Sequence, residues 1–176
     1  TTSYRKAMPV TFTENGTIKS LSIYHNGGSG QVLMGVYYDA SGAPSSRLGV
    51  SASTTVNTAA GWQTVVLSSP VSVSSGQTVW LSWVFENIVG TRYTEGTPAR
   101  AQSTASWAGG MPTTFGTASF ANYKYSLYCT YTPGSAKEAG DESKASDGPL
   151  DVNSVYMEKE EVLIYPNPTD GNITVA

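Results

Sequence analysis

The sequence has few of the residues from which most enzyme active sites are built. Its 176 residues include one histidine, His25, and one cysteine, Cys129, and only 13% of them are charged, about half the usual share. A lone cysteine excludes a disulfide framework within the chain and a metal site made of cysteines. The residues around His25 are typical of a strand end rather than of a catalytic base. Cys129 is expected to be a small buried hydrophobic residue.

Long apolar runs and clusters of positive charge are also missing. No run approaches the roughly 18 apolar residues that a transmembrane helix requires, so the sequence predicts no membrane span. The net charge of −3 is unevenly distributed: residues 1–133 carry seven Lys or Arg against four acidic residues, and residues 134–176 carry three against nine. A weak positive balance without a basic cluster argues against nucleic acid as a partner. The change of sign predicts a domain boundary near residue 134.

Glycine and aromatic residues are abundant, with 18 Gly, 11 Tyr and 4 Trp. Such a composition is typical of extracellular β-proteins, whose surfaces use Tyr, Ser, Thr and Gly in place of Lys and Glu. The richest stretch, residues 78–86, contains two indoles and predicts a central strand. Trp83 would share one face with the aliphatic residues of this strand, and Trp80 would lie on the opposite face.

Short β-type runs separated by turn residues extend from residue 8 to residue 132, and no segment shows a sustained helical period. We therefore predict an all-β fold, an antiparallel β-sandwich of jelly-roll type with eight or nine strands. The strands are expected at residues 10–13, 17–25, 31–39, 47–54, 62–67, 71–73, 78–86, 92–95 and 123–132.

Residues 96–122 have almost no aliphatic side chains, which predicts a long loop. A loop of this length within a domain is usually functional or disordered. Trp107, Phe115 and Phe120 favour a packed, functional loop.

The acidic residues 134–160 predict a flexible, disordered linker. Residues 161–176 suggest two short strands around a tight turn, which are too few to form a core of their own. We expect them to be the start of a module that is cut short at the end of the chain. Three domains are thus predicted, at residues 1–133, 134–160 and 161–176.

The last of these segments contains YPNP at residues 165–168, TDG at 169–171 and ITV at 173–175. These residues resemble the C-terminal sorting domain of type IX secretion cargo. The resemblance covers about the last fifteen residues, without the lysine-rich end of such a domain. It implies that the type IX secretion machinery of a Gram-negative bacterium exports the protein, which is then secreted or attached to the outer surface.

The front domain contains GVYYD at residues 35–39 with GAP at 42–44, GWQTV at 61–65 and SGQTVWL at 75–81. Over residues 17–131 it resembles β-sandwich accessory modules that are appended to secreted polysaccharide-degrading enzymes and surface proteins, and that are similar to carbohydrate-binding modules. The resemblance implies non-catalytic glycan recognition and a covalently attached catalytic domain in the full-length protein. It assigns no individual contact residue.

Candidate sugar-contacting residues are aromatic, because the C–H groups of a pyranose ring pack against aromatic faces. Trp107 is the first candidate, since its small neighbours cannot bury an indole locally. Trp80 is a candidate because it lies opposite Trp83. Trp62 opens a strand, where an indole either contacts ligand or packs under a loop.

Polar candidates stand beside the expected long loop. Arg92, Tyr93 and Glu95 precede it and offer donor, stacking and acceptor groups, and Arg100 lies just inside it. The alternative for the charged residues is an Arg–Glu surface pair without function. No cofactor is expected. Structural calcium at Asp39 would need further oxygen ligands from the backbone, because Ca²⁺ takes six to eight.

The sequence thus predicts a secreted, non-catalytic module that binds a polysaccharide, plant β-glucan such as cellulose, and targets an attached enzyme to it. One alternative is a structural or adhesive surface module, in which Trp80 and Trp107 would be buried. The other is a small glycosidase or lyase, which would need two catalytic acids. The acids available in residues 1–133 are Glu14, Asp39, Glu86 and Glu95.

Overall fold

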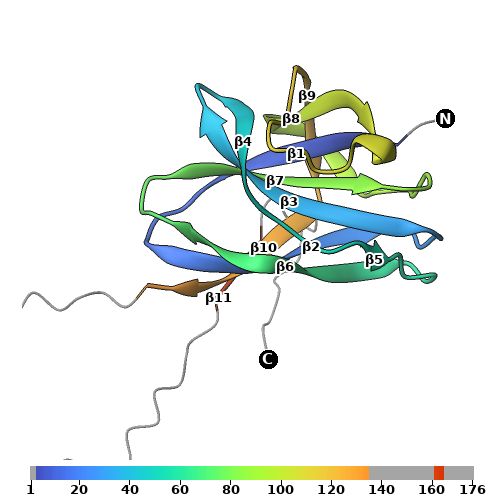
Figure 1. Cartoon of the computed structure of the whole chain (residues 1–176), viewed down its shortest axis with the longest axis horizontal. Coiled ribbons are helices and arrows are strands. Elements are labelled where there is room, and N and C mark those ends of the chain that lie inside the picture. Colours follow the sequence, from blue (N-terminus) through green and yellow to red (C-terminus); the bar gives the residue numbers. More distant parts are fainter. Residues whose placement is uncertain (1–2, 135–160, 165–176) are drawn as a thin grey trace, which may run out of the picture.

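The computed structural model describes residues 3–134 and 161–164. They form two antiparallel sheets that pack face to face, which confirms the predicted all-β sandwich (Figure 1). The larger sheet contains, in order, β4 (Ala43–Val50), β3 (Gln31–Ala40), β7 (Thr78–Phe85), β1 (Tyr4–Thr11), β8 (Tyr93–Ser106) and β9 (Ala118–Tyr125), with β5 (Thr54–Thr55) paired to β3. The smaller sheet contains β11 (Glu161–Ile164), β10 (Leu127–Pro133), β2 (Gly16–His25) and β6 (Gly61–Val73).

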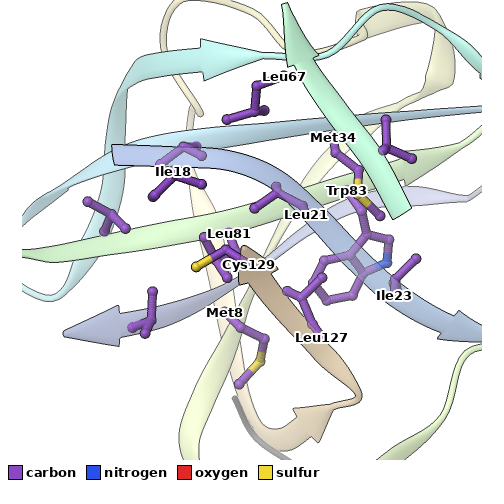
Figure 2. Packing of buried hydrophobic residues seen from close by; sticks show 14 of the residues in the cluster. Met8, Ile18, Leu21, Ile23, Met34, Leu67, Leu81, Trp83, Leu127 and Cys129 are labelled. Atoms are coloured by element: carbon purple, nitrogen blue, oxygen red, sulfur yellow. The ribbon is translucent and has the colours of Figure 1, made fainter. Parts of the chain in front are cut away.

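The main core lies between the sheets and is centred on β7. Trp83 is 1% exposed and packs among residues of both sheets, including Met34 of β3 and Leu127 of β10 (Figure 2). The whole predicted inner face of β7 is in this cluster, and so is Cys129, as expected. Strand alternation therefore located the core side of the central strand correctly.

A second, smaller core covers the opposite face of the larger sheet. Trp80 of β7 and Tyr37 of β3 pack there against Met111 and Phe115. The latter two come from the segment that follows a short 3₁₀ helix, η1 (Trp107–Gly109), and this segment lies on the side of the larger sheet away from the smaller one (Figure 1). The larger sheet is therefore buried on both faces around β7.

The prediction of one long loop over residues 96–122 is wrong for most of that range. Residues up to Ser106 belong to β8 and residues from Ala118 belong to β9, so only residues 107–117 connect the two strands. β8 pairs with both β1 and β9. Small polar residues form these strands because backbone pairing on both sides holds β8 in the sheet, although it has no aliphatic face of its own.

Several strand ends also differ from expectation. β6 is continuous from Gly61 to Val73, whereas the sequence predicts two runs, 62–67 and 71–73, because of Pro70. Proline is tolerated there because β6 is an edge strand, where the missing N–H need not serve a neighbour. β2 ends at His25, as the sequence predicts.

The strand expected near the start of residues 161–176 is present as β11. It pairs antiparallel with β10, with Tyr128 opposite Ile164 and Tyr131 opposite Glu161. Apart from residue 134, the predicted linker 134–160 lies outside the described residues, as do residues 165–176, in which a sorting motif is predicted. Among the described residues, no helix is long and apolar enough to cross a membrane.

Candidate functional site

An aromatic cluster lies on the outer face of the smaller sheet and is centred on Trp62. Along β6, Gln63 and Val65 point into the sandwich, so strand alternation places Trp62 outside, where it is 40% exposed. Trp62 is opposite Tyr24 of β2 in register. The two ring centroids are 5.7 Å apart at an interplanar angle of 89°, and the Tyr128 ring is 4.9 Å from Trp62 at 60°.

Arg92 completes this group, hereafter the Trp62 cluster (Trp62, Tyr24, Tyr128 and Arg92). Its guanidinium carbon lies 5.8 Å from the Tyr24 ring centroid, within the range of a cation–π interaction. Two backbone hydrogen bonds hold residue 92 close to Tyr24. The Arg92 carbonyl accepts a 3.0 Å hydrogen bond from the Ser126 N–H, and the Ser126 carbonyl accepts one from the Tyr24 N–H. The side chain of Arg92 is exposed and has no carboxylate partner among the described residues. It is therefore a cation beside a surface of aromatic rings.

Trp107 borders a second surface feature. It opens η1, is half-buried and packs against the second core. Its indole lines an open hollow of about 510 Å³ together with Glu86, Asn87 and Ile88 from the end of β7 and with Ser3, Ser106 and Ala108. The hollow combines one aromatic ring with a carboxylate, an amide and two hydroxyl groups, which is the mixture found in sites that bind polar ring compounds.

Trp80, a candidate sugar contact because it lies opposite Trp83, is buried. It is 3% exposed because residues 107–117 cover this face of the larger sheet and because the Phe120 ring packs 6.1 Å from its own. Its Nε1 donates a 2.6 Å hydrogen bond to Oδ1 of Asp39. Trp80 also lines a hollow of about 300 Å³ together with Pro98 and Phe120. Trp80 thus has a structural partner and is almost entirely shielded from solvent.

Asp39, the residue considered for calcium, serves a turn. Its Oδ2 accepts a 3.1 Å hydrogen bond from the Gly42 N–H, while Oδ1 accepts the one from Trp80. In the described part of the chain, no group of three or more His, Cys, Asp or Glu side chains is placed to hold a metal ion.

The remaining candidates, Tyr93, Glu95 and Arg100, lie along β8. The Tyr93 ring is 51% exposed and lies 5.0 Å from the Tyr123 ring and 5.4 Å from the Tyr125 ring. Glu95 is exposed and forms no ion pair with Arg92 or Arg100 within the described residues. The alternative of a non-functional Arg–Glu pair is therefore not realised there.

The only histidine has a structural role. His25 is fully buried; its Nδ1 accepts a 3.0 Å hydrogen bond from the Gly27 N–H, so Nε2 carries the hydrogen and donates to Oε1 of Gln63 at 2.8 Å. Gln63 in turn holds the end of β5 by donating to the Thr55 carbonyl at 2.8 Å. The imidazole is thus committed to holding a strand end.

Two residues of the Trp62 cluster are not among the sequence candidates. Tyr128 falls on the outer face of its strand by alternation, and Tyr24 precedes His25 on β2. The signal that would have found both is the register of β2 with β6 and β10, which brings residues far apart in sequence to one place. Of the seven predicted site residues, the structure gathers Trp62 and Arg92 in one cluster and Tyr93, Glu95 and Arg100 along β8, and leaves Trp107 and Trp80 apart.

The described fold places the chain among all-β sandwich proteins. No family model, curated protein or solved structure matches it. The candidate surfaces therefore have to be judged by their own residues.

Proposed function

We propose that the chain is a non-catalytic carbohydrate-binding module of a secreted bacterial polysaccharide-degrading protein. Its ligand is a polysaccharide, namely a plant β-glucan such as cellulose, which binds at the Trp62 cluster. The observation that carries the proposal is an indole that remains 40% exposed although two tyrosine rings pack against it. Aromatic rings gathered on an outer face contribute little to a core, and exposed apolar groups of this kind mark interaction sites.

The chemistry of the Trp62 cluster suits a sugar chain. Aromatic rings offer apolar faces to the C–H groups of pyranose rings, and Arg92 adds N–H donors for the hydroxyl groups. Because Tyr24 and Tyr128 hold Trp62 in place, little side-chain freedom is lost when a ligand binds. An open sheet face, unlike a closed pocket, accepts a polymer along its length.

The hollow beside Trp107 is the second contact in this proposal. Glu86 and Asn87 provide an acceptor and an amide next to the indole. Two weak contacts on one polymer raise the overall affinity by effective concentration, which is also how the module would keep a tethered enzyme near its substrate.

Export belongs to the same proposal. It is supported by residues 165–168, 169–171 and 173–175, which resemble the C-terminal sorting domain of type IX secretion cargo. The protein would then act in the medium or on the outer surface, where insoluble polysaccharide is found.

A structural or adhesive surface module is the second candidate. It is favoured by the burial of Trp80, which this alternative requires. Trp107, which it also requires to be buried, is only half-buried.

A pull-down of the 176-residue chain with insoluble cellulose, chitin and xylan tests the proposal. Trp62→Ala and Trp107→Ala are compared with Tyr38→Ala, a matched control because Tyr38 is 47% exposed and lies outside both surfaces. We expect binding to cellulose that falls by about tenfold in Trp62→Ala, the effect of losing one stacked ring, and that is unchanged in Tyr38→Ala. A folded chain that binds none of the polymers would favour the structural module. Binding lost only in Trp107→Ala would move the site to the hollow.

A further inference from the structure

A group of cations and tyrosines lies where β1, β8 and β9 run side by side. Lys6 is opposite Trp83 in register, so it lies on the face of the larger sheet that is turned toward the smaller one. Its Nζ is 6.0 Å from the ring centroid of Tyr125. Arg100 of β8 has its guanidinium carbon 6.0 Å from the Tyr123 centroid, and its positive charge acts on the nearby Tyr125 hydroxyl by lowering the pKa that burial raises.

Within residues 3–134 and 161–164, these two cations have no counter-charge: neither Lys6 nor Arg100 forms an ion pair there. The nearest acid along β8, Glu95, is exposed and opposite Tyr123 in register. Nε and Nη1 of Arg100 are shielded from solvent and have no hydrogen-bond partner in this part of the chain. The two positive charges are thus partly withdrawn from water without the carboxylate that usually accompanies such a group.

The two cations also influence each other. Burial lowers the pKa of Lys6, and the positive charge of Arg100 lowers it further. Two neighbouring like charges in a partly desolvated site repel each other, and an anion placed beside them would relieve this repulsion. Lys6 and Arg100 as whole residues are each only partly buried.

We propose that Lys6 and Arg100 bind an oxyanion, the carboxylate or sulfate group of an acidic saccharide. The planar guanidinium offers paired N–H donors that match the two oxygens of such a group, and the ammonium adds a point charge. The tyrosine rings favour a saccharide over a free ion, because Tyr93 presents a half-exposed ring that stacks on Tyr123 and Tyr125 and would accommodate a pyranose ring.

The site adjoins the Trp62 cluster in the chain but has its own residues. Arg92 and Tyr93 are consecutive, and the Arg92 side chain lies over Tyr24 while the Tyr93 ring packs on Tyr123 and Tyr125. The two surfaces can therefore be tested separately, and the oxyanion site does not depend on glucan binding at Trp62.

The test is isothermal titration of the 176-residue chain with sodium trigalacturonate, with sodium sulfate and with neutral cellotriose, at constant ionic strength set with NaCl. We expect trigalacturonate to bind more tightly than sulfate. Arg100→Ala and Lys6→Met should each weaken it by about tenfold, the effect of losing one charge-assisted contact. Arg100→Lys should recover part of the affinity, because it keeps the charge but not the paired donors.

Two further variants separate the oxyanion site from the glucan surface and from a purely structural pair of cations. Glu95→Gln should tighten trigalacturonate binding by about twofold, because it removes a negative charge from the same face. The Glu95→Gln variant also tests the oxyanion site if Arg100→Ala fails to fold. Trp62→Ala should leave trigalacturonate binding unchanged, because Trp62 belongs to the glucan surface. Sulfate binding as tight as that of trigalacturonate would overturn the assignment to a saccharide. Trigalacturonate binding that is absent, or that is indifferent to Lys6, Arg100 and Glu95, would overturn the oxyanion site.

Discussion

The guanidinium of Arg5 lies 4.9 Å from the ring centroid of Phe115, and its Nη2 donates a 2.5 Å hydrogen bond to the carbonyl oxygen of the same residue. Nη1 donates at 2.8 Å to the Gly110 carbonyl, and Nη2 also reaches the Ser103 hydroxyl at 3.2 Å. Arg5 is 2% exposed. One buried side chain of the first strand therefore holds the segment between β8 and β9 against the outer face of the larger sheet.

Replacing Arg5 by Met should destabilise the protein by about 2–4 kcal/mol, because it leaves buried carbonyl oxygens without donors. Arg5→Lys should be only slightly better, since one ammonium cannot reach all three acceptors in the same geometry. Urea unfolding measures the free energies. A loss below about 0.5 kcal/mol in Arg5→Met, which is the usual range for surface substitutions, would contradict the role of Arg5 as the tether of this segment.

A second prediction concerns alkaline pH. Burial raises the pKa of the Cys129 thiol from 9.0 to about 12 and that of the Tyr37 hydroxyl from 10.0 to about 12, the latter against the opposing charges of Arg5 and Arg47. In both groups the folded state holds the proton more tightly than the unfolded state. Their stabilisation is therefore complete below about pH 9 and is lost as the pH rises toward 12.

We expect the unfolding free energy to fall by about 1.4 kcal/mol per pH unit between pH 9 and 12 for Cys129 alone. Cys129→Ala should have a shallower slope over this range, even though the substitution itself lowers the stability at neutral pH. Urea unfolding at a series of pH values gives the slopes. Equal slopes in the two proteins would show that the thiol does not contribute.

The exposure of the four tryptophans can be measured directly. Trp80 and Trp83 are buried, Trp107 is half-buried and Trp62 is 40% exposed. Acrylamide should therefore quench mainly Trp62. We expect Trp62→Phe to remove the larger part of the quenchable fluorescence, and Trp80→Phe to leave it in place. If Trp80→Phe removes it instead, the outer face of the larger sheet is open in solution.

Features that depend on the alternation of side chains within one strand can be predicted from the sequence. The inward face of β7, the burial of Cys129 and the strand end at His25 follow from neighbours along the chain. The same alternation placed Trp80 on the opposite face from Trp83, but it left open whether that face is exposed. Alternation gives the face of the sheet, but it does not reveal that residues 107–117 cover that face.

The candidate surfaces depend on long-range register, which alternation does not supply. Trp62 meets Tyr24 and Tyr128 only because β2 pairs with β6 on one side and with β10 on the other. Lys6 approaches Arg100 because β1 and β8 pair across almost a hundred residues of sequence. The sequence identifies Trp62 as a candidate aromatic residue and Arg92 as a candidate donor. It does not reveal that the two residues lie in the same place.

The pairing of β11 with β10 leads to a last prediction. β10 has β2 on one side, and on the other side β11 occupies the row of N–H and C=O groups from Tyr128 to Tyr131. A chain that ends at residue 134 would lose β11 and leave this edge unpaired, and unpaired edges promote association between copies. We expect this chain to form concentration-dependent dimers, while the 176-residue chain remains monomeric, as measured by light scattering after size exclusion.

Thr130→Lys in the short chain is the control, because a lysine on an edge strand opposes pairing and should restore the monomer. A short chain that stays monomeric at high concentration without this substitution would show that β11 is not needed to protect the edge.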